Sequence, residues 1–231
     1  MSSPAPERDT SPVIAVDGPS GTGKGALCQR LAGHLHWHLL DSGAVYRSLT
    51  YLALNKGACL ENPEQLARLA DGLDIRFLVL DEIRVLVGGE DVTEAIRAEE
   101  CGSIASRIAE YPAVRQALLA KQRVFRKPPG LIADGRDMGT VVFPGAALKL
   151  YLTASPEERA GRRYKQLKEK GIDVSLQHLS LDIAERDRRD CERVVAPLRA
   201  APNAVIIDTT EMGIEAVVRQ AMRLIAERGL A

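Results

Sequence analysis

The sequence has no excess of charge of either sign. Lysine and arginine together number 31, aspartate and glutamate also number 31, and the formal net charge at pH 7 is +0. Proteins that attract nucleic acid or anionic membranes through their overall field carry a basic excess. We therefore expect neither nucleic acid nor a membrane as a partner.

Cysteine is scarce as well. The four cysteines, Cys28, Cys59, Cys101 and Cys191, lie far apart and form no C-x-x-C pair. Disulfide frameworks and zinc sites show dense or regularly spaced cysteines. The sequence favours neither, and we expect a reducing compartment, the cytoplasm.

Long apolar runs are also lacking. No stretch approaches the length of a membrane-spanning helix, and residues 1–10 are polar and have no apolar core of the kind found in signal peptides. We interpret them as a frayed terminus. The 231 residues, of which 45% are apolar, suffice for one domain with a sizeable core and inserted subdomains.

Residues 11–25 combine a buried strand, a glycine-rich turn and the start of a helix. The apolar run at 13–16 is typical of a strand buried on both faces. Residues 18–24 fit the phosphate-loop (P-loop) pattern G-x-x-x-x-G-K, and apolar residues at helical spacing follow. Backbone N–H groups and a helix N-terminus can together hold a polyphosphate. The alternative is an ordinary strand-to-helix turn, which the lysine and both flanks disfavour.

Position 25 departs from the commonest form of this loop. The usual pattern ends in serine or threonine, whose hydroxyl binds magnesium, whereas Gly25 follows Lys24 here. Magnesium in phosphate sites keeps several waters, so we expect nucleotide phosphates, waters and a carboxylate elsewhere to hold it. The ending G-K-G is associated with nucleoside monophosphate kinases and disfavours a switch GTPase or a motor ATPase.

Five short apolar runs separated by helical segments predict the fold class. The runs lie at residues 13–16, 37–41, 131–133, 148–152 and 204–208. Helices are predicted at 26–35, 44–56, 64–72, 100–109, 112–126 and 214–228. Two more are predicted between these last two ranges: one begins at residue 156, and the other ends at residue 193. Such alternation predicts an α/β protein with a doubly wound, five-stranded parallel sheet. Ser42 is expected to cap the helix at 44–56.

An insert at about residues 60–97 interrupts this rhythm. Residues 75–80 and 83–87 alternate around Asp81 and Glu82, which indicates a β-hairpin, and Val92 and Thr93 could begin a third strand. We expect an antiparallel flap beside the main sheet.

Two further segments carry clustered charge. Residues 134–137, Asp-Gly-Arg-Asp, directly follow a predicted strand, where open α/β sheets bind ligands; a charged surface turn is the alternative. Residues 155–158 form a capping sequence for a helix, and a break at 171–175 separates it from a second arginine-rich helix. This helical hairpin, about 159–193, is either a solvated, salt-bridged surface or a lid over the phosphates. The first helix presents three arginines on one face: Arg159, Arg162 and Arg163.

His34, His36 and His38 could suggest a metal site. Their alternation straddles the end of a predicted helix and the start of a strand, so the three rings are not expected to converge as metal ligands do. We expect solvated or packed side chains.

Four motifs together resemble the bacterial-type cytidylate kinases of the nucleoside monophosphate kinase family. They are GPSGTGKG, LLDSGAVYR, IADGRDMGTVVFP and ERDRRDCERVVAPL, and the match runs in register from about Pro12 to the C-terminus. The resemblance implies one P-loop kinase domain over residues 1–231, with the insert as its monophosphate-binding subdomain. It also implies transfer of the γ-phosphoryl group of ATP to CMP or dCMP, with Mg²⁺.

The resemblance also implies roles for particular residues. ATP would be held by the loop and by two lid arginines: Gly18, Pro19, Ser20, Gly21, Thr22, Gly23, Lys24, Gly25, Ala26, Arg159 and Arg163. CMP would be held by Ser42, Arg47, Ser106, Arg115, Arg136, Asp137, Arg186 and Asp190. The catalytic residues would be Lys24, Arg136, Arg186 and Arg162. Further lid contacts around the transferring group would come from Arg189 and Arg193.

Within this set, Arg47, Arg136 and Arg186 would clamp the α-phosphate of the acceptor, and Asp190 would meet the sugar hydroxyl. A carboxylate that accepts from the exocyclic amine distinguishes cytosine from uracil, and this assigns base choice to Asp137. Asp134 would hold magnesium through water.

Two rival functions remain open from the sequence. A kinase for another small acceptor, such as a metabolite alcohol, would share the loop but would need a positioned base and fewer arginines. A nucleotide sensor would need only the loop, so Lys24 together with two arginine clusters favours transfer. We expect a monomer, since no heptad seam or obligate apolar face is evident.

Overall fold

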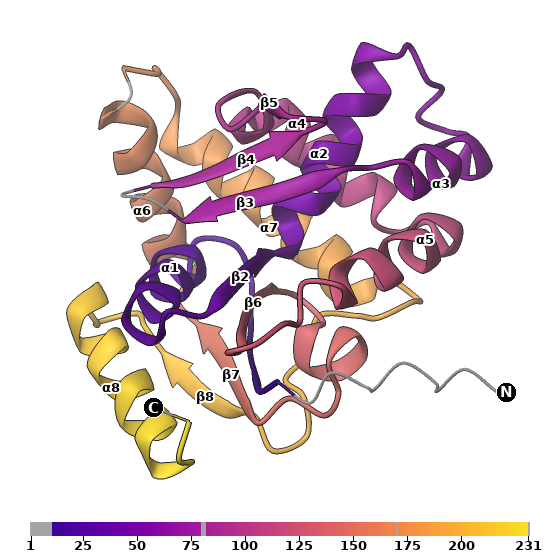
Figure 1. Ribbon diagram of the computed structural model, residues 1–231. Coiled ribbons are helices and arrows are strands. Elements are labelled where there is room, and N and C mark those ends of the chain that lie inside the picture. The colour runs from indigo at the N-terminus through magenta and orange to yellow at the C-terminus, as the bar shows by residue number, and fades with distance from the viewer. Residues whose placement is uncertain (1–10, 80–81, 170, 231) are drawn as a thin grey trace, which may run out of the picture.

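A five-stranded parallel sheet lies at the centre of the computed structural model (Figure 1). The spatial order of the strands is β2-β6-β1-β7-β8. Their bounds are β1 Val13–Asp17, β2 His38–Asp41, β6 Leu131–Gly135, β7 Leu148–Thr153 and β8 Val205–Asp208. All five predicted strands are confirmed, and so is the doubly wound parallel sheet. The chain leaves the central β1 toward one edge and later returns to the other, so the carboxyl end of β1 borders the crevice where such sheets bind ligands.

The structure describes residues 11–79, 82–169 and 171–230. Two expectations from the sequence lie wholly or partly outside this range. They are the frayed terminus at residues 1–10 and the hairpin turn, of which Leu80 and Asp81 are not described.

The alternation of side chains along β1 divides the core into two layers. Ile14 and Val16 face a buried cluster that includes residues of α1 (Lys24–Leu35) and α8 (Ile214–Glu227). Val13 and Ala15 face a second cluster built with α2 (Ser42–Asn55) and α5 (Pro112–Arg123). Because both faces of the strand are buried, its sequence is almost continuously apolar.

One predicted helix cap is wrong. Ser42 is the first residue of α2, and the capping hydrogen bond comes from Asp41, whose Oδ1 accepts from the N–H of Ala44 at 2.8 Å. The last residue of β2 therefore caps the helix, because no loop separates the strand from it. The cap of α3 (Pro63–Asp71) by Asn62 is present, as is the bond from the N–H of Glu158 to Ser155 at the start of α6 (Pro156–Glu169).

The insert contains a three-stranded antiparallel sheet in the order β3-β4-β5. Strands β3 (Ile75–Val79) and β4 (Ile83–Val87) form the predicted hairpin. The third strand, β5 (Glu90–Asp91), lies two residues before the predicted position, because Gly88 and Gly89 turn the chain with φ values of 58° and 88°. A short 3₁₀ helix, η1 (Ala95–Arg97), leads into α4 (Glu99–Ile108).

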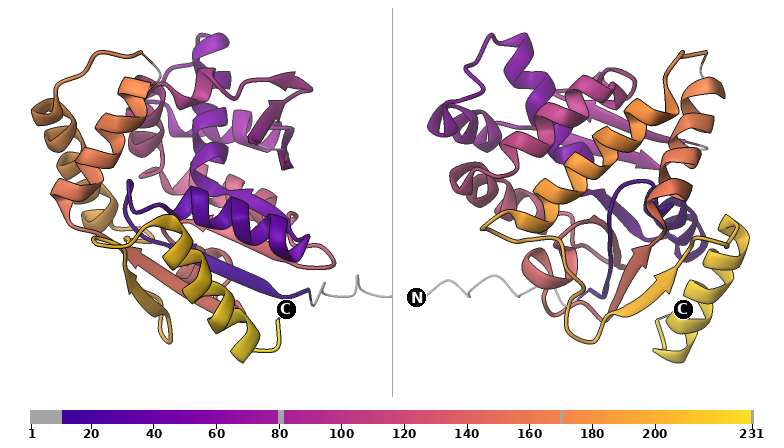
Figure 2. Two further views of the ribbon diagram at one scale, coloured as in Figure 1. Left: turned by 90° about the vertical axis from the view of Figure 1, so that its left-hand side faces the viewer. Right: turned by 180° about the vertical axis from the view of Figure 1, so that it is seen from behind.

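The helical hairpin is formed by α6 and α7 (Leu176–Glu192). In the two views of Figure 2, this hairpin and the insert extend from the same end of the central sheet. Both therefore stand beside the carboxyl ends of the strands. Among the described residues, none of the helices has the length and apolar character that crossing a membrane requires.

One turn of π-helix, η2 (Met138–Val142), follows β6 and was not predicted from the sequence. Its first two N–H groups donate to the carboxylate of Asp17 at the end of β1. This contact joins the segment after β6 to the residue that precedes the P-loop.

Candidate active site

The P-loop wraps the end of β1 and the start of α1. Gly18 has φ of +144°, and a Cβ at this position would lie 2.1 Å from the carbonyl oxygen of Leu152. A Cβ at Gly21 would lie 2.8 Å from the Cβ of Arg159. These two glycines are required because the loop lies directly against β7 and α6.

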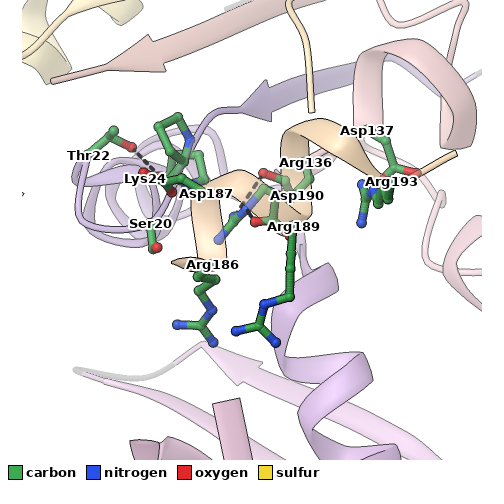
Figure 3. Close-up of polar contacts among 12 residues, drawn as sticks. Ser20, Thr22, Lys24, Arg136, Asp137, Arg186, Asp187, Arg189, Asp190 and Arg193 are labelled. Atoms are coloured by element: carbon green, nitrogen blue, oxygen red, sulfur yellow. Dashed lines mark hydrogen bonds and ion pairs between the residues drawn. The ribbon is translucent and has the colours of Figure 1, made fainter. Parts of the chain in front are cut away.

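Lys24 is a buried cation at the first position of α1, with 6% of the residue exposed. Its Nζ donates to the carbonyl oxygen of Pro19 at 2.7 Å, and Thr22 Oγ1 donates to the same oxygen at 3.0 Å (Figure 3). Burial, and then the charge of Arg136, lower the pKa of Lys24 to about 8. A bound polyphosphate would offset both effects, because it brings negative charge to the lysine.

Asp134 lies beneath the loop, and its environment fits an indirect role in magnesium binding. A Cβ at Gly25 would lie 3.7 Å from Asp134 Oδ2, so the glycine leaves the carboxylate open toward the loop. Burial raises the pKa of Asp134 to about 6, although the charge of Lys24 opposes this. Within the described part of the chain no group of three or more His, Cys, Asp or Glu side chains could hold a metal ion. One carboxylate with phosphates and waters is a donor set that suits Mg²⁺.

All eight residues expected to hold CMP line one pocket of about 70 Å³. They are Ser42, Arg47, Ser106, Arg115, Arg136, Asp137, Arg186 and Asp190. They come from α2, α4, α5, the segment after β6, and α7. Segments more than 140 residues apart along the chain therefore meet in one place. We call this the acceptor pocket.

One end of the acceptor pocket is basic. The Nε of Arg136 donates to Asp190 at 2.8 Å, and an Nη of Arg186 donates to the carbonyl oxygen of Gly102 at 2.8 Å. Arg47 pairs with Asp41 at 3.1 Å. Burial and the charges of Arg136 and Arg47 lower the pKa of Arg186 to about 10. Neighbouring guanidinium groups that disfavour one another's charge form a site for an anion.

The other end of the pocket holds Asp137, with 4% of the residue exposed. It forms an ion pair with Arg115. The guanidinium carbon of Arg115 lies over the ring of Tyr46, 5.9 Å from the ring centroid. The guanidinium group of Arg193 is 3.9 Å from Asp137. Among the residues that the structure describes, an Nη of Arg193 and the hydroxyl of Ser106 are buried and have no hydrogen-bond partner. These polar atoms are available to a ligand, since buried polar groups normally find partners.

Arg193 therefore lies elsewhere than expected from the resemblance. It was grouped with the lid residues around the transferring phosphate, but its side chain lies beside Asp137 (Figure 3). The helix ends at Glu192, and Arg193 has extended backbone angles of φ −57° and ψ 137°. The helix was predicted to run to residue 193, one residue beyond its observed end.

A second cavity, of about 470 Å³, lies on the other side of the P-loop. It is lined by Thr22, Gly23 and Ala26 from the loop and α1, by Glu158 and Arg162 from α6, and by residues 209–214. We call it the donor cavity. Arg162 is fixed at its wall, because its guanidinium group donates to the carbonyl oxygen of Thr209 at 2.5 Å and to Glu158 at 2.9 Å.

The remaining lid arginines are also tied to protein groups. Arg159 donates to the carbonyl oxygen of Ser20 at 3.1 Å and pairs with Asp187 at 2.6 Å, so it fastens the hairpin to the P-loop. Arg163 pairs with Glu99 on α4. Figure 3 shows Arg186 and Arg189 extending from α7 in a common direction beside the loop.

Sequence reasoning missed three features of the site. These are Asp17, the Tyr46 ring under Arg115, and the 209–214 segment of the donor cavity. Tyr46 lies inside one of the quoted motifs, LLDSGAVYR, and Asp17 directly precedes the P-loop. The 209–214 segment has no local pattern that marks it. The three histidines are exposed, and His38 contacts the carbonyl oxygen of Pro128 at 3.0 Å, which agrees with the expected solvated side chains.

A family model described as cytidylate kinase matches residues 14–227. The cytidylate kinase of Nitrosococcus oceani is 58% identical over 91% of this chain and 94% of the relative. That of Methylococcus capsulatus is 54% identical over 94% and 98%, and that of Shewanella oneidensis is 54% identical over 95% and 97%.

Proposed function

The chain belongs to the cytidylate kinase family, and from this premise we propose that it transfers the γ-phosphoryl group of ATP to CMP and dCMP. The products are ADP and CDP or dCDP. One observation carries the proposal: a pocket with three arginines at one end and a buried carboxylate at the other adjoins a P-loop. A nucleoside monophosphate has the matching polarity, with a phosphate at one end and a hydrogen-bonding base at the other.

In this proposal the acceptor phosphate binds among Arg47, Arg136 and Arg186. Phosphoryl transfer through a loose transition state depends mostly on positioning and on neutralising charge. Lys24, Arg136, Arg186 and Arg162 are the proposed catalytic residues. Because the acceptor is an ionised phosphate at neutral pH, no general base is required.

The base of the acceptor is read at the opposite end of the pocket. Asp137 accepts from the exocyclic amine of cytosine, a group that uracil lacks. The unpartnered atoms of Ser106 and Arg193, with Arg115, supply further polar contacts. Asp190 meets the sugar hydroxyl, and Ser42 helps to orient the phosphate.

ATP binds with its phosphates along residues 18–26 and its base in the donor cavity. The volume of that cavity, about 470 Å³, lies within the range of about 300–1,000 Å³ usual for small-molecule sites. Arg159 and Arg163 contribute from the lid, about residues 159–193. Asp134 is the residue that would hold Mg²⁺ through water when the ion accompanies ATP, and the ion would neutralise phosphate charge.

We further propose that the lid and the insert, about residues 60–97, close over the two nucleotides, because an open site would let water compete for the phosphoryl group. The whole chain acts as one P-loop kinase domain. We expect a cytoplasmic monomer whose partners are nucleotides.

A coupled assay of ADP release tests the proposal. The protein is supplied with ATP, Mg²⁺ and in turn CMP, dCMP, UMP, AMP or GMP. Strong turnover of CMP and dCMP with weak turnover of UMP is expected. No turnover with any of the five, while ATP still binds, would contradict the proposal and would favour another acceptor or a sensor.

A further inference from the structure

Asp17 links the P-loop to the turn that follows Asp137, although no role was expected for it from the sequence. It is the last residue of β1 and is 3% exposed. Its Oδ1 accepts from the N–H of Met138 at 2.8 Å, and its Oδ2 accepts from the N–H of Gly139 at 2.8 Å. The next residue in the chain is Gly18, the first glycine of the P-loop.

The two N–H groups belong to the first turn of η2, directly after Asp137. First-turn N–H groups lack partners within a helix, and the side chain of the residue before the helix commonly accepts from them. Asp137 occupies that position but forms no capping hydrogen bond. Instead, the side chain of Asp17 at the end of β1 accepts from these two N–H groups and so caps η2. The carboxylate of Asp137 therefore stays available to Arg115 and to a bound base.

Gly139 fits this arrangement closely. A Cβ at position 139 would lie 3.4 Å from Asp17 Oδ2 and 3.2 Å from the Cβ of Ala201. The turn is held between these two groups, with little room to shift. A buried carboxylate that accepts two N–H bonds gives stronger bonds than a neutral acceptor.

We propose that Asp17 is a positioning residue for base recognition, whose carboxylate fixes the turn that carries Asp137 relative to the P-loop. Asp17 lines neither the acceptor pocket nor the donor cavity, and it acts through the backbone of Met138 and Gly139. This inference rests on the proposed function, because it concerns how cytosine is recognised there.

The variant Asp17→Asn tests it. Asparagine has nearly the same size, but its amide group is a donor, so one of the two N–H groups loses its acceptor. Losing a buried hydrogen bond to a charged group corresponds to roughly a 10-fold effect or more. We expect the KM for CMP to rise about 10-fold, and the ratio of kcat/KM for CMP over UMP to fall by a similar factor. The KM for ATP should change by less than about twofold.

Two further variants separate positioning from stability. Ile225→Val removes one methylene group from the fully buried cluster under α8, which lines neither cavity. It should lower the melting temperature and leave the CMP to UMP ratio unchanged. Gly139→Ala keeps Asp17 but crowds the same hydrogen bond from the other side, and it should lower the ratio.

The outcomes are distinguishable. A wild-type protein without CMP kinase activity would refute the proposed function itself. An active wild type with an unchanged CMP to UMP ratio in Asp17→Asn would overturn the role of Asp17. If neither Asp17→Asn nor Gly139→Ala folds, the carboxylate serves the fold alone, and the proposal is likewise overturned.

Discussion

Lys24 shows at the scale of one residue how the site is prepared for a ligand. It is a buried cation whose Nζ donates to the backbone carbonyl of Pro19. Burying a charge lowers stability unless nearby groups compensate for it. The depressed pKa of Lys24, about 8, reflects this cost. We therefore propose that the lysine serves phosphate binding rather than the stability of the fold.

Replacing Lys24 with methionine should separate activity from stability. We expect kcat to fall about 100-fold or more, as happens when one preorganised donor to the transition state is removed. The melting temperature should stay the same or rise, because a buried charge is lost. The matched control is Lys56→Met at an exposed position, which should change neither. A loss of activity that merely follows a loss of folded protein would contradict the role of Lys24.

Asp17 makes the stability of the protein depend on pH in an unusual direction. Burial raises the pKa of Asp17 to about 6, although its bonds from Gly139 and Met138 lower it. Between about pH 4 and pH 6 the folded protein keeps this proton and the unfolded chain has lost it. The contribution of Asp17 to the unfolding free energy therefore falls as pH rises, by at most about 1.4 kcal/mol per pH unit.

Denaturant titrations at several pH values check this prediction. The unfolding free energy of the wild type minus that of Asp17→Asn should decrease from pH 4 to pH 6.5. A difference that is constant or increases over this range would show that the carboxylate titrates near its ordinary value.

At the scale of elements, apolar runs predicted the strands, but contacts across the chain decided the details. The five runs predicted the sheet because short, continuously apolar runs between helical segments are typical of strands in a parallel sheet. The predicted position of β5 was wrong because Gly88 and Gly89 turn the chain earlier. The predicted cap of α2 was wrong because β2 runs directly into this helix. The π-helix η2 carries no local pattern, and Asp17 stabilises it from β1.

The arginines of α6 show that local sequence patterns also leave the contacts of the site undetermined. The helical spacing correctly placed Arg159, Arg162 and Arg163 on one helix, α6. It could not show that they also contact Thr209, Glu99 and the carbonyl oxygen of Ser20, because these groups lie 47 to 139 residues away along the chain. The eight residues proposed to hold CMP nevertheless line one pocket.

The α6 arginines should differ in their effects. Arg162 forms the wall of the donor cavity, whereas Arg163 pairs with Glu99 outside both cavities. Arg162→Ala is therefore expected to raise the KM for ATP about 10-fold, since it removes hydrogen bonds made by a charged group, and to change the KM for CMP little. Arg163→Ala also removes a proposed contact to ATP, but one that the lid makes from outside the donor cavity, so it should raise the KM for ATP less than Arg162→Ala does. Steady-state kinetics with each substrate varied in turn provides the measurement, and equal effects of the two variants would contradict the assignment.

At the scale of the whole molecule, the two cavities differ greatly in size. The donor cavity measures about 470 Å³ and the acceptor pocket about 70 Å³. Small-molecule sites usually have volumes of at least about 300 Å³. We therefore expect the acceptor pocket to enlarge when a nucleotide binds, and α4 and α7 are among the elements that line it.

Two natural cysteines allow this movement to be measured. Cys59, beside the start of the insert, and Cys191, on α7, are exposed, whereas Cys28 and Cys101 are buried. The distance between spin labels on Cys59 and Cys191 should lengthen when CMP binds. It should shorten when a non-hydrolysable ATP analogue is added and the lid and insert close. A distance that stays constant through both additions would show that side-chain rotations alone make the room.

The most direct test of the account is a crystal structure with CMP and a non-hydrolysable ATP analogue bound together. The account predicts the cytosine amine within hydrogen-bonding distance of Asp137 and the α-phosphate among Arg47, Arg136 and Arg186. The ATP analogue should lie along the P-loop, with its base in the donor cavity. CMP bound outside the acceptor pocket, or bound with its phosphate toward Asp137, would contradict it.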